Sequence, residues 1–513
     1  MSRLQKFAKL AVVASAGLIP GVALASAEAP NEVVCRIPVG AAGISYANEG
    51  VEEAKAWGPA ALEVAPDGSF WVADTVGRRL LHYSSTCAQL DVIQLRDVSG
   101  ITDLAVTGSS LYAFDASAAV PTVLHFSLSG TEYARHPVAT DITGITLSEN
   151  GEVLVERQYG ASYQQLLDRD GKPSTASLPG LMAGGKVYNA RAADLSRTEA
   201  HTGTLSIGGQ TVAVSVPNDL GGLRVLGVTR DGNVVTKLEE VALVNDFRVD
   251  QTVRVYGQDG TLLGQARVPL AERYTYVQNG LSLSPKGEVF SLMTYRDRAE
   301  IQKLGFEREL PAVLPVITQR REDTPPPPTT QCRLANDMAN AGNWLADFVR
   351  GYTTTNISGA CTGRTKPNFL VSAGTAYRGE AYDWGGWDNP TQYDNALNAG
   401  LQAGDINTAG VESCSHGADC SGLVSVAWAT SIKYGTSTLP NISTQLANRS
   451  SMTKGDIMNC AGSHVVMFDY YTSNGIFMWE ETMSNYYDRA VHINREWAYF
   501  SSCYVPRRYN SKC

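Results

Sequence analysis

The sequence predicts an exported, multidomain chain, with an all-β propeller of six blades followed by an α+β domain. Three observations lead to this prediction. A strand–turn–strand pattern recurs between residues 35 and 315, a run of four prolines interrupts the chain near residue 325, and the residue pattern changes after it. With 513 residues the chain is also longer than one ordinary hydrophobic core accommodates.

The first residues have the layout of a secretory signal peptide. Three basic residues precede an apolar stretch, Leu10–Leu24, which is followed by small residues. Cleavage after Ala25 or Ala27 is expected, with the signal over residues 1–27 and a periplasmic or extracellular product. The apolar stretch is short and is interrupted by glycine and proline, which disfavours a membrane anchor. No membrane span is expected after the signal is removed.

Charge and cysteine content narrow the function classes. Removal of the signal takes the formal charge from −9 to −12, so nucleic acid is not an expected partner. The number of cysteines is odd, and structural thiols of exported proteins normally pair, which leaves at least one thiol over. Cys35 and Cys87 are isolated from the rest and are expected to pair with each other. The cysteines are residues 35, 87, 332, 361, 414, 420, 460, 503 and 513.

Five strand–turn–strand hairpins define the repeat. Successive hairpins begin 42, 41, 81 and 55 residues apart, and a degenerate unit at 203–216 fills the double interval. A further strand such as "LLHYSSTC" follows several of the hairpins and is expected to be the outer strand of its unit. Six units of four short strands predict a six-bladed propeller over 35–315, with a pair of β-sandwiches as the alternative. The hairpins begin at Leu62, Leu104, Ile145, Leu226 and Leu281.

The repeated units resemble NHL-type and related bacterial propellers, and no catalytic constellation stands out in them. His82 and His125 occupy the same place in successive repeats, which indicates packing rather than ligand binding. We therefore expect this half to be a scaffold or a binding platform for a protein or glycan partner. A proline-rich linker is expected over 316–331, and the second domain over 332–513.

The segment "GADCSGLVSVAW" carries the first chemical signal of the second domain. Its apolar residues recur at helical spacing, with Asp419 as N-cap and Cys420 in the first turn. A thiol at a helix N-terminus is expected to favour the nucleophilic thiolate, although a disulfide at this position is an equal alternative. Downstream, His464 begins the apolar strand "HVVMF", and a histidine held on a strand can accept a thiol proton.

Three motifs in order, "YDWGG", "DCSGLV" and "GDI…HVVMF", resemble the NlpC-type cell-wall cysteine peptidases over residues 366–500. The resemblance implies a compact papain-like fold that needs no cofactor. It implies that Cys420 is the nucleophile and His464 the general base, with Tyr382 near the oxyanion. Asp419 and Ser421 would contact the free amine of the substrate, or serve only as helix cap and local hydrogen-bond partner.

The third catalytic group departs from the family pattern. Family members usually place a histidine on the next strand, but here that strand reads "GIFMWEETMS". Glu480 is the favoured replacement because "WEET" resembles a "Y-E-x-T" pattern of related sequences with Glu480 in the key place, and a carboxylate can fix the imidazole tautomer. Glu481 is the alternative, since adjacent strand residues face opposite ways, and His492 is a third choice.

The spacing before Asp419 also departs from the family, because about thirty extra residues follow Gly386. This insert is expected to form part of a substrate wall or lid. Cys414, His416 and Cys420 lack a convincing fourth ligand, so no metal is expected. A disulfide between Cys414 and Cys460 is expected instead.

Together these features predict an exported cysteine hydrolase that cleaves an amide bond in peptidoglycan stem peptides. Cleavage between D-glutamate and the diamino acid is the first choice, with N-acetylmuramoyl-L-alanine amidase activity as a lesser one. Two alternatives to this prediction stay open. The first is a propeller-based binding protein whose second domain is inactive. The second is a cysteine hydrolase that acts on a non-wall substrate.

Overall fold

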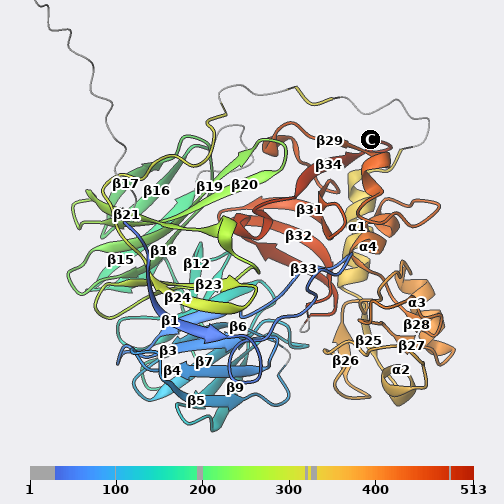
Figure 1. Ribbon diagram of the computed structural model, residues 1–513, viewed down its shortest axis with the longest axis horizontal. Coiled ribbons are helices and arrows are strands. Elements are labelled where there is room, and N and C mark those ends of the chain that lie inside the picture. The colour runs from blue at the N-terminus through green and yellow to red at the C-terminus, as the bar shows by residue number, and fades with distance from the viewer. Residues whose placement is uncertain (1–28, 99, 193–199, 318–321, 325–331, 485–486) are drawn as a thin grey trace, which may run out of the picture.

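The computed structural model describes residues 29–98, 100–192, 200–317, 322–324, 332–484 and 487–513. A ring of small sheets, blue to yellow in Figure 1, lies beside a second body of helices and one larger sheet, yellow to red. The signal peptide predicted at 1–27 lies outside the described residues, as does most of the linker. None of the helices in the described part has the length and apolar character that crossing a bilayer requires.

The ring is a propeller of six four-stranded sheets, as predicted. Five blades use four consecutive strands each. The first three blades contain β2 (Ala61–Val64), β3 (Phe70–Asp74), β4 (Arg79–Tyr83), β5 (Gln89–Gln94), β6 (Ile101–Val106), β7 (Ser110–Asp115), β8 (Thr122–Ser127), β9 (Glu132–Pro137), β10 (Ile142–Leu147), β11 (Val153–Arg157), β12 (Ser162–Leu167) and β13 (Ser177–Leu178).

The other three blades include the one that closes the ring. In this last blade, β22, β23 and β24 are joined by β1 from the start of the described chain. The strands are β14 (Leu181–Ala183), β15 (Lys186–Ala192), β16 (Thr202–Ile207), β17 (Gln210–Ser215), β18 (Asp219–Val228), β19 (Val234–Leu243), β20 (Phe247–Tyr256), β21 (Leu262–Val268), β22 (Leu281–Leu283), β23 (Val289–Tyr295), β24 (Arg298–Lys303) and β1 (Glu32–Pro38), with the 3-10 turn η1 (Leu270–Glu272) before β22.

Ring closure depends on β1, which pairs antiparallel with β24. The expected disulfide between Cys35 and Cys87 is present and ties this closing strand to the turn after β4 in the first blade. The two half-cystines lie 52 residues apart, so the bond links the two blades at the point where the ring is joined.

Two details of the repeat differ from the sequence prediction. The strands expected to be outermost are third in their blades, because β5, β9, β13 and β21 follow them. The degenerate hairpin at 203–216 forms the outer pair β16 and β17 rather than an inner pair. Both differences arise because hairpin periodicity identifies neighbouring strands but does not give their place in the sheet.

The repeated histidines have the predicted packing role. His82 stacks on Trp71 with ring centroids 4.0 Å apart, and His125 stacks on Tyr112 at 4.5 Å. Each histidine also pairs through Nε2 with a serine hydroxyl at 3.0 Å. Burial lowers the pKa of both imidazoles, which favours the neutral form that such stacking needs.

The second body contains a six-stranded sheet in the order β29-β34-β30-β31-β32-β33, together with four α-helices. Its elements are α1 (Ala335–Ala346), β25 (Val349–Gly351), α2 (Thr354–Ser358), β26 (Ala376–Arg378), α3 (Pro390–Asn398), β27 (Gln402–Ala403), β28 (Ser415–His416), α4 (Cys420–Ala427), η2 (Leu439–Ile442), β29 (Ser443–Gln445), η3 (Arg449–Ser451), β30 (Ile457–Cys460), β31 (His464–Thr472), β32 (Gly475–Thr482), β33 (Arg489–Arg495), η4 (Trp497–Phe500) and β34 (Val505–Tyr509).

Both faces of this sheet are buried. Along β31, Val465 and Met467 pack with helices α1 and α4, whereas Val466 and Phe468 point to the opposite side. On that opposite side they join a core that includes Phe247 of the propeller and Trp497 of η4. The alternation of a strand therefore joins the sheet to its helices on one face and to the propeller on the other.

Three further disulfides lie in the second body: Cys332–Cys513, Cys361–Cys414 and Cys460–Cys503. The expected Cys414–Cys460 pair is wrong, because each of these residues has a different partner that lies nearer in the fold. Cys420 is the free cysteine, as expected. Four disulfides are consistent with a protein of an oxidising compartment.

The closing disulfide leads to a stability prediction. Replacing both Cys35 and Cys87 with serine should lower the free energy of unfolding by about 2–4 kcal/mol, because the unfolded chain loses a loop constraint. Urea unfolding followed by tryptophan fluorescence measures this change. Hydrogen exchange should also accelerate in β1 and β24, whereas the neighbouring control Thr86→Ala should leave it unchanged. Unaltered protection of β1 would contradict the proposed role in ring closure.

Candidate functional site

The site begins at the N-terminus of α4. Asp419 caps this helix by accepting the Gly422 amide at 2.7 Å, and its second carboxylate oxygen accepts the Gly385 amide at 3.0 Å. The Ser421 hydroxyl donates to Asp419 at 2.9 Å. Lys433 forms an ion pair with the same carboxylate. Asp419 and Ser421 are thus both buried and form hydrogen bonds that stabilise the start of the helix. Their contact with a substrate amine stays a prediction.

Cys420 is fully buried in the first turn of α4. The backbone amide of Val465 donates a hydrogen bond to its sulfur, which brings the start of β31 against the thiol. Burial, followed by the carboxylates of Glu53 and Asp419, raises the pKa of the thiol well above its usual value. The thiolate expected from the helix position alone is therefore disfavoured in this arrangement, because desolvation and two acidic neighbours outweigh the helix dipole.

His464 opens β31 and is buried, and it directly precedes Val465, whose amide contacts the Cys420 sulfur. Its Nε2 lies 2.8 Å from Oε1 of Glu480 on β32. A carboxylate accepts at this distance, so Nε2 carries the proton. Among the described residues, Nδ1 has no hydrogen-bond partner although it is buried. The second ring nitrogen is thus not engaged by another described residue.

Glu480 is held ionised by its neighbours. Arg495 donates to its Oε2 at 2.8 Å and Tyr499 donates its hydroxyl to Oε1 at 2.5 Å. Burial opposes ionisation, but the Arg495 charge and the hydrogen bonds from His464 and Tyr499 outweigh it and lower the pKa of Glu480. This carboxylate can therefore fix the tautomer of His464 and stabilise its protonated form.

The two other candidates for the third group lie elsewhere. Glu481 is buried on the opposite side of β32, where burial and the carboxylate of Glu380 raise its pKa well above the usual value. His492 pairs with Asp469 at 2.9 Å and stacks on Trp479. Strand alternation thus places Glu480 alone of the three beside His464.

Tyr382 lies on the other side of the thiol and is completely buried. Its hydroxyl donates to the backbone carbonyl of Glu53 at 2.9 Å, and Cys420 Sγ lies 3.3 Å from the same oxygen. Tyr382 and Cys420 therefore contact the same carbonyl oxygen, and the role of Tyr382 near an oxyanion stays a prediction.

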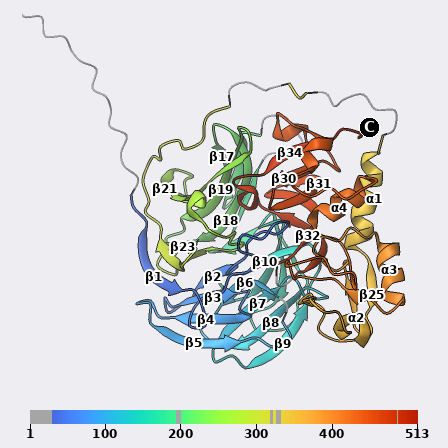
Figure 2. The same ribbon diagram turned by 45° about the vertical axis from the view of Figure 1, so that its right-hand side comes forward.

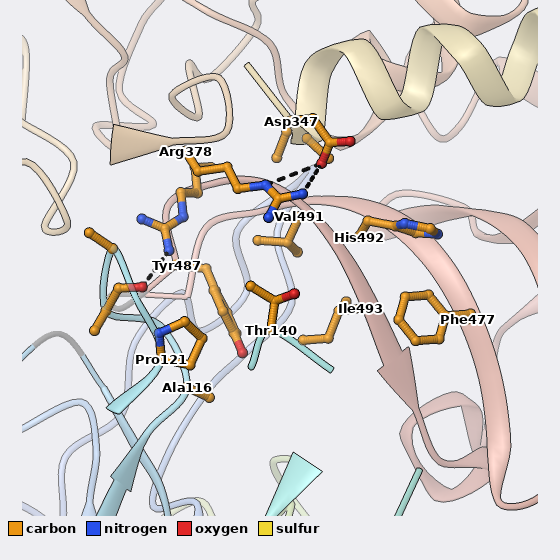
Figure 3. Close-up of a pocket in the computed structure, with 15 residues that line it drawn as sticks. Ala116, Pro121, Thr140, Asp347, Arg378, Phe477, Tyr487, Val491, His492 and Ile493 are labelled. Carbon is orange, nitrogen blue, oxygen red and sulfur yellow. Dashed lines mark hydrogen bonds and ion pairs between the residues drawn. The ribbon is translucent and has the colours of Figure 1, made fainter. Parts of the chain in front are cut away.

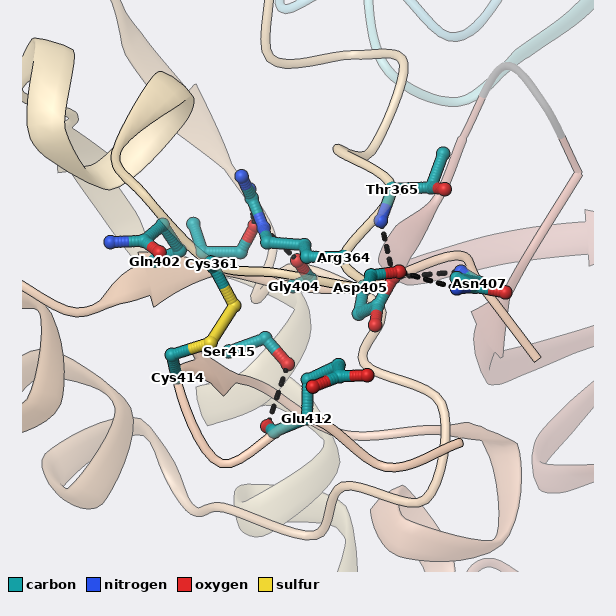
Figure 4. Close-up of a disulfide and its surroundings, with 12 residues drawn as sticks. Cys361, Arg364, Thr365, Gln402, Gly404, Asp405, Asn407, Glu412, Cys414 and Ser415 are labelled. Atoms are coloured by element: carbon teal, nitrogen blue, oxygen red, sulfur yellow. Dashed lines mark hydrogen bonds between the residues drawn. A yellow bond between two sulfur atoms is a disulfide. The ribbon is translucent and has the colours of Figure 1, made fainter. Parts of the chain in front are cut away.

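The predicted insert folds beside this region around α3. The Cys361–Cys414 disulfide attaches its end to the chain before it (Figure 4). Asp405 stabilises the turn by accepting the backbone amides of Thr365 and Asn407 at 2.8 and 2.7 Å. His416 pairs with Asp388 at 2.7 Å, and the Cys414 sulfur is used in the disulfide, so the two do not form a metal site with Cys420.

Cavities also lie outside the Cys420 region in the described part of the chain, and two of them involve the propeller. One, about 170 Å³, lies between the propeller residues Pro121 and Thr140 and the second-body residues Arg378 and Tyr487 (Figure 3). The other, about 250 Å³, lies on the propeller alone. Several buried ionisable groups line this second cavity, and burial raises the pKa of one of them, Glu63, to about 8. The spacing of the repeats in the sequence did not predict that these ionisable residues would lie together.

The thiol itself is covered by a propeller segment that sequence reasoning missed. In Figures 1 and 2 the blue connection between β1 and β2 leaves the ring and reaches the red and orange elements. Its residue Glu53 contacts Cys420, and Lys55 donates to the Tyr499 carbonyl at 2.5 Å. No motif marks these residues, because their role depends on an approach between segments far apart in the chain.

No family model and no curated protein matches the chain. Among solved structures it is similar to virginiamycin B lyase from Staphylococcus aureus (11% identity, TM-score 0.28, covering 48% of this chain and 94% of that one). It is similar to Myxococcus xanthus glutaminyl cyclase (13%, 0.29, 54% and 97%) and to the RRP9 WD40 repeats (11%, 0.31, 54% and 100%). These likenesses are weak, and no activity or ligand is transferred from them.

The two adjacent glutamates provide a matched test of the His464 partner. Glu480→Gln should lower the free energy of unfolding by about 3–5 kcal/mol, because buried Arg495 loses its carboxylate partner. Glu481→Gln should cost less than about 1 kcal/mol, since a raised pKa keeps that carboxyl protonated and an amide resembles it. Urea unfolding measures both.

Nitrogen NMR of the His464 ring reports which ring nitrogen is protonated, independently of the free energy of unfolding. Glu480→Gln should change the tautomer ratio, whereas Glu481→Gln should leave Nε2 protonated. Equal effects of the two substitutions on the ring would contradict the assignment of Glu480.

Proposed function

We propose that the protein is exported and that its second body is a papain-like cysteine hydrolase. This domain would cleave an amide bond in the stem peptides of peptidoglycan. The pairing of His464 with ionised Glu480, beside the buried free thiol of Cys420, carries this proposal. The Nδ1 of His464 has no hydrogen-bond partner among the described residues, which supports a role as general base.

The proposed reaction proceeds through a thioester. His464 Nδ1 takes the thiol proton, and the Cys420 sulfur attacks the carbonyl carbon of the substrate amide. The oxyanion accepts a hydrogen bond from the Tyr382 hydroxyl, and protonated His464 returns its proton to the leaving amine. Water then attacks the thioester, loses a proton to His464, and releases a carboxylic acid while the thiol is restored. Glu480 keeps His464 in the required tautomer throughout.

The contacts of Glu53 indicate which chemical group the cleft binds beside the thiol. Thr436 binds the side-chain carboxylate of Glu53 through its amide and its hydroxyl at 2.8 and 2.9 Å. The cleft therefore provides donors for a carboxylate near the reacting carbonyl. The choice of endopeptidase over amidase activity is proposed from the family resemblance.

The propeller is proposed to bind or position the wall or a protein partner. The alternative, a binding protein with an inactive second body, has one observation in its favour, since the Cys420 thiol is covered and its pKa is raised. A third possibility keeps the chemistry but changes the substrate to a non-wall amide or ester. Substrate trials distinguish these possibilities.

Incubation with peptidoglycan tests the proposed function. The mature protein should release soluble muropeptides, and Cys420→Ala should release none, as resolved by mass spectrometry. Tyr382→Phe should lower the rate about 10²–10³-fold if the hydroxyl stabilises the oxyanion. The variant Glu53→Ala is also assayed, because Glu53 covers the thiol and wild type could be inactive for that reason alone. Absence of fragments from both wild type and Glu53→Ala would reject wall hydrolysis.

A further inference from the structure

We propose that residues 51–55, the plug, are a built-in inhibitor that occupies the Cys420 cleft as a bound peptide would. The proposal rests on the cysteine site described above and adds its regulation. The plug belongs to the connection 39–60 between β1 and β2, so the propeller supplies the inhibitor and the second body supplies the cleft.

The contacts of Glu53 place it at the reacting centre. Cys420 Sγ lies 3.3 Å from the Glu53 carbonyl oxygen and 3.4 Å from its carboxylate Oε2, and the thiol proton has no other acceptor as close among its described contacts. Tyr382 donates to the same carbonyl, and Thr436 holds the other carboxylate oxygen. One plug residue thus engages the nucleophile, the predicted oxyanion donor and the cleft wall together.

The residues on either side of Glu53 extend the occupied length. Trp384 donates its indole N–H to the Glu52 carbonyl at 3.2 Å, and Ser463 donates to the Ala54 carbonyl at 3.4 Å. Ala54 is only 3% exposed and packs with Tyr382 and Met483. Backbone carbonyls of three consecutive residues therefore accept hydrogen bonds from the second body, although the plug itself forms a turn at residues 52–54 rather than an extended strand.

Lys55 anchors the far end of the plug. Its ammonium lies 3.4 Å from the centroid of the Tyr499 ring, and Tyr499 is the residue that donates to Glu480. Asn48, before the plug, donates to the Met483 carbonyl. Polar contacts therefore hold the plug at both ends as well as at the thiol, so it does not rest on a single interaction.

The seated plug has two consequences for the chemistry. A substrate carbonyl has no access to Cys420 while Glu53 occupies that position. The Glu53 carboxylate also favours the protonated thiol, since it places a negative charge and a proton acceptor beside the sulfur. Displacement of the plug by a ligand or a wall contact of the propeller would remove both effects together.

Thiol labelling tests the plug without any wall substrate. The full chain, with its disulfides intact, is treated with iodoacetamide over a range of pH, and Cys420 labelling is followed by intact mass. Glu53→Ala should label about ten-fold faster than wild type, because the contacts of a charged carboxylate are lost. Its labelling should also begin at lower pH. The matched control is Glu52→Ala, whose side chain is exposed and whose labelling should equal wild type.

A second variant tests whether displacement of the whole plug, and not only the loss of one side chain, accelerates the labelling of Cys420. Ala54→Arg does not fit its buried position, so it should expel the plug and label as fast as Glu53→Ala. A synthetic peptide of residues 48–57 should then slow the labelling of Ala54→Arg, and the same peptide with Glu53→Ala should not. Equal labelling rates in wild type, Glu53→Ala and Ala54→Arg would overturn the proposal.

The outcomes separate the plug from the proposed function. Faster labelling without muropeptide release would keep the plug and reject the wall substrate. Equal muropeptide release by wild type and Glu53→Ala, with rapid labelling of both, would keep the hydrolase and reject the plug. Cleavage of wild type between Glu53 and Ala54, absent in Cys420→Ala, would make the segment a substrate and overturn the inhibitor assignment.

Discussion

The sheet of β30 to β33 is buried on both faces, and the rest of the second body depends on this constraint. Helices α1 and α4 cover one face and the propeller covers the other. A strand between two packed layers has no freedom to shift its register, because a one-residue slip would exchange its two faces. His464 and Glu480 belong to neighbouring strands of this sheet, so their 2.8 Å contact is fixed by the fold.

The same packing explains how a buried carboxylate stays charged. Glu480 lies in the interior, where ionisation is costly, yet it faces Arg495, Tyr499 and His464. The hydrogen bonds from these three neighbours compensate the carboxylate for the water it loses on burial. Its residues come from β31, β32, β33 and η4. The catalytic assignment and the docking of the sheet against the propeller are therefore linked, since η4 also contributes to the interface core.

The propeller influences the site through its closing connection. The β1–β2 connection leaves the ring next to the strand that closes it, and the Cys35–Cys87 disulfide holds that strand. The plug therefore starts from a rigid base, and the chain before it is itself held to the blades, since Ile44 is buried and the Ser45 amide donates to Asp74 at 2.8 Å. This arrangement would allow the propeller to act as more than a passive platform, because a ligand that moves the connection would expose Cys420.

The sequence by itself determined the elements whose signals are local. Hairpin turns recur in the chain and predicted the blades, the Asp419 cap predicted the start of α4, and the odd cysteine count predicted a free thiol. It left Glu480 and Glu481 as alternatives, because the loop before β32 hides the register. Tertiary structure alone decided that register, the partners of Cys414 and Cys460, and the raised pKa of the Cys420 thiol. The plug is the clearest case, since Glu53 and Cys420 are 367 residues apart and only packing brings them together.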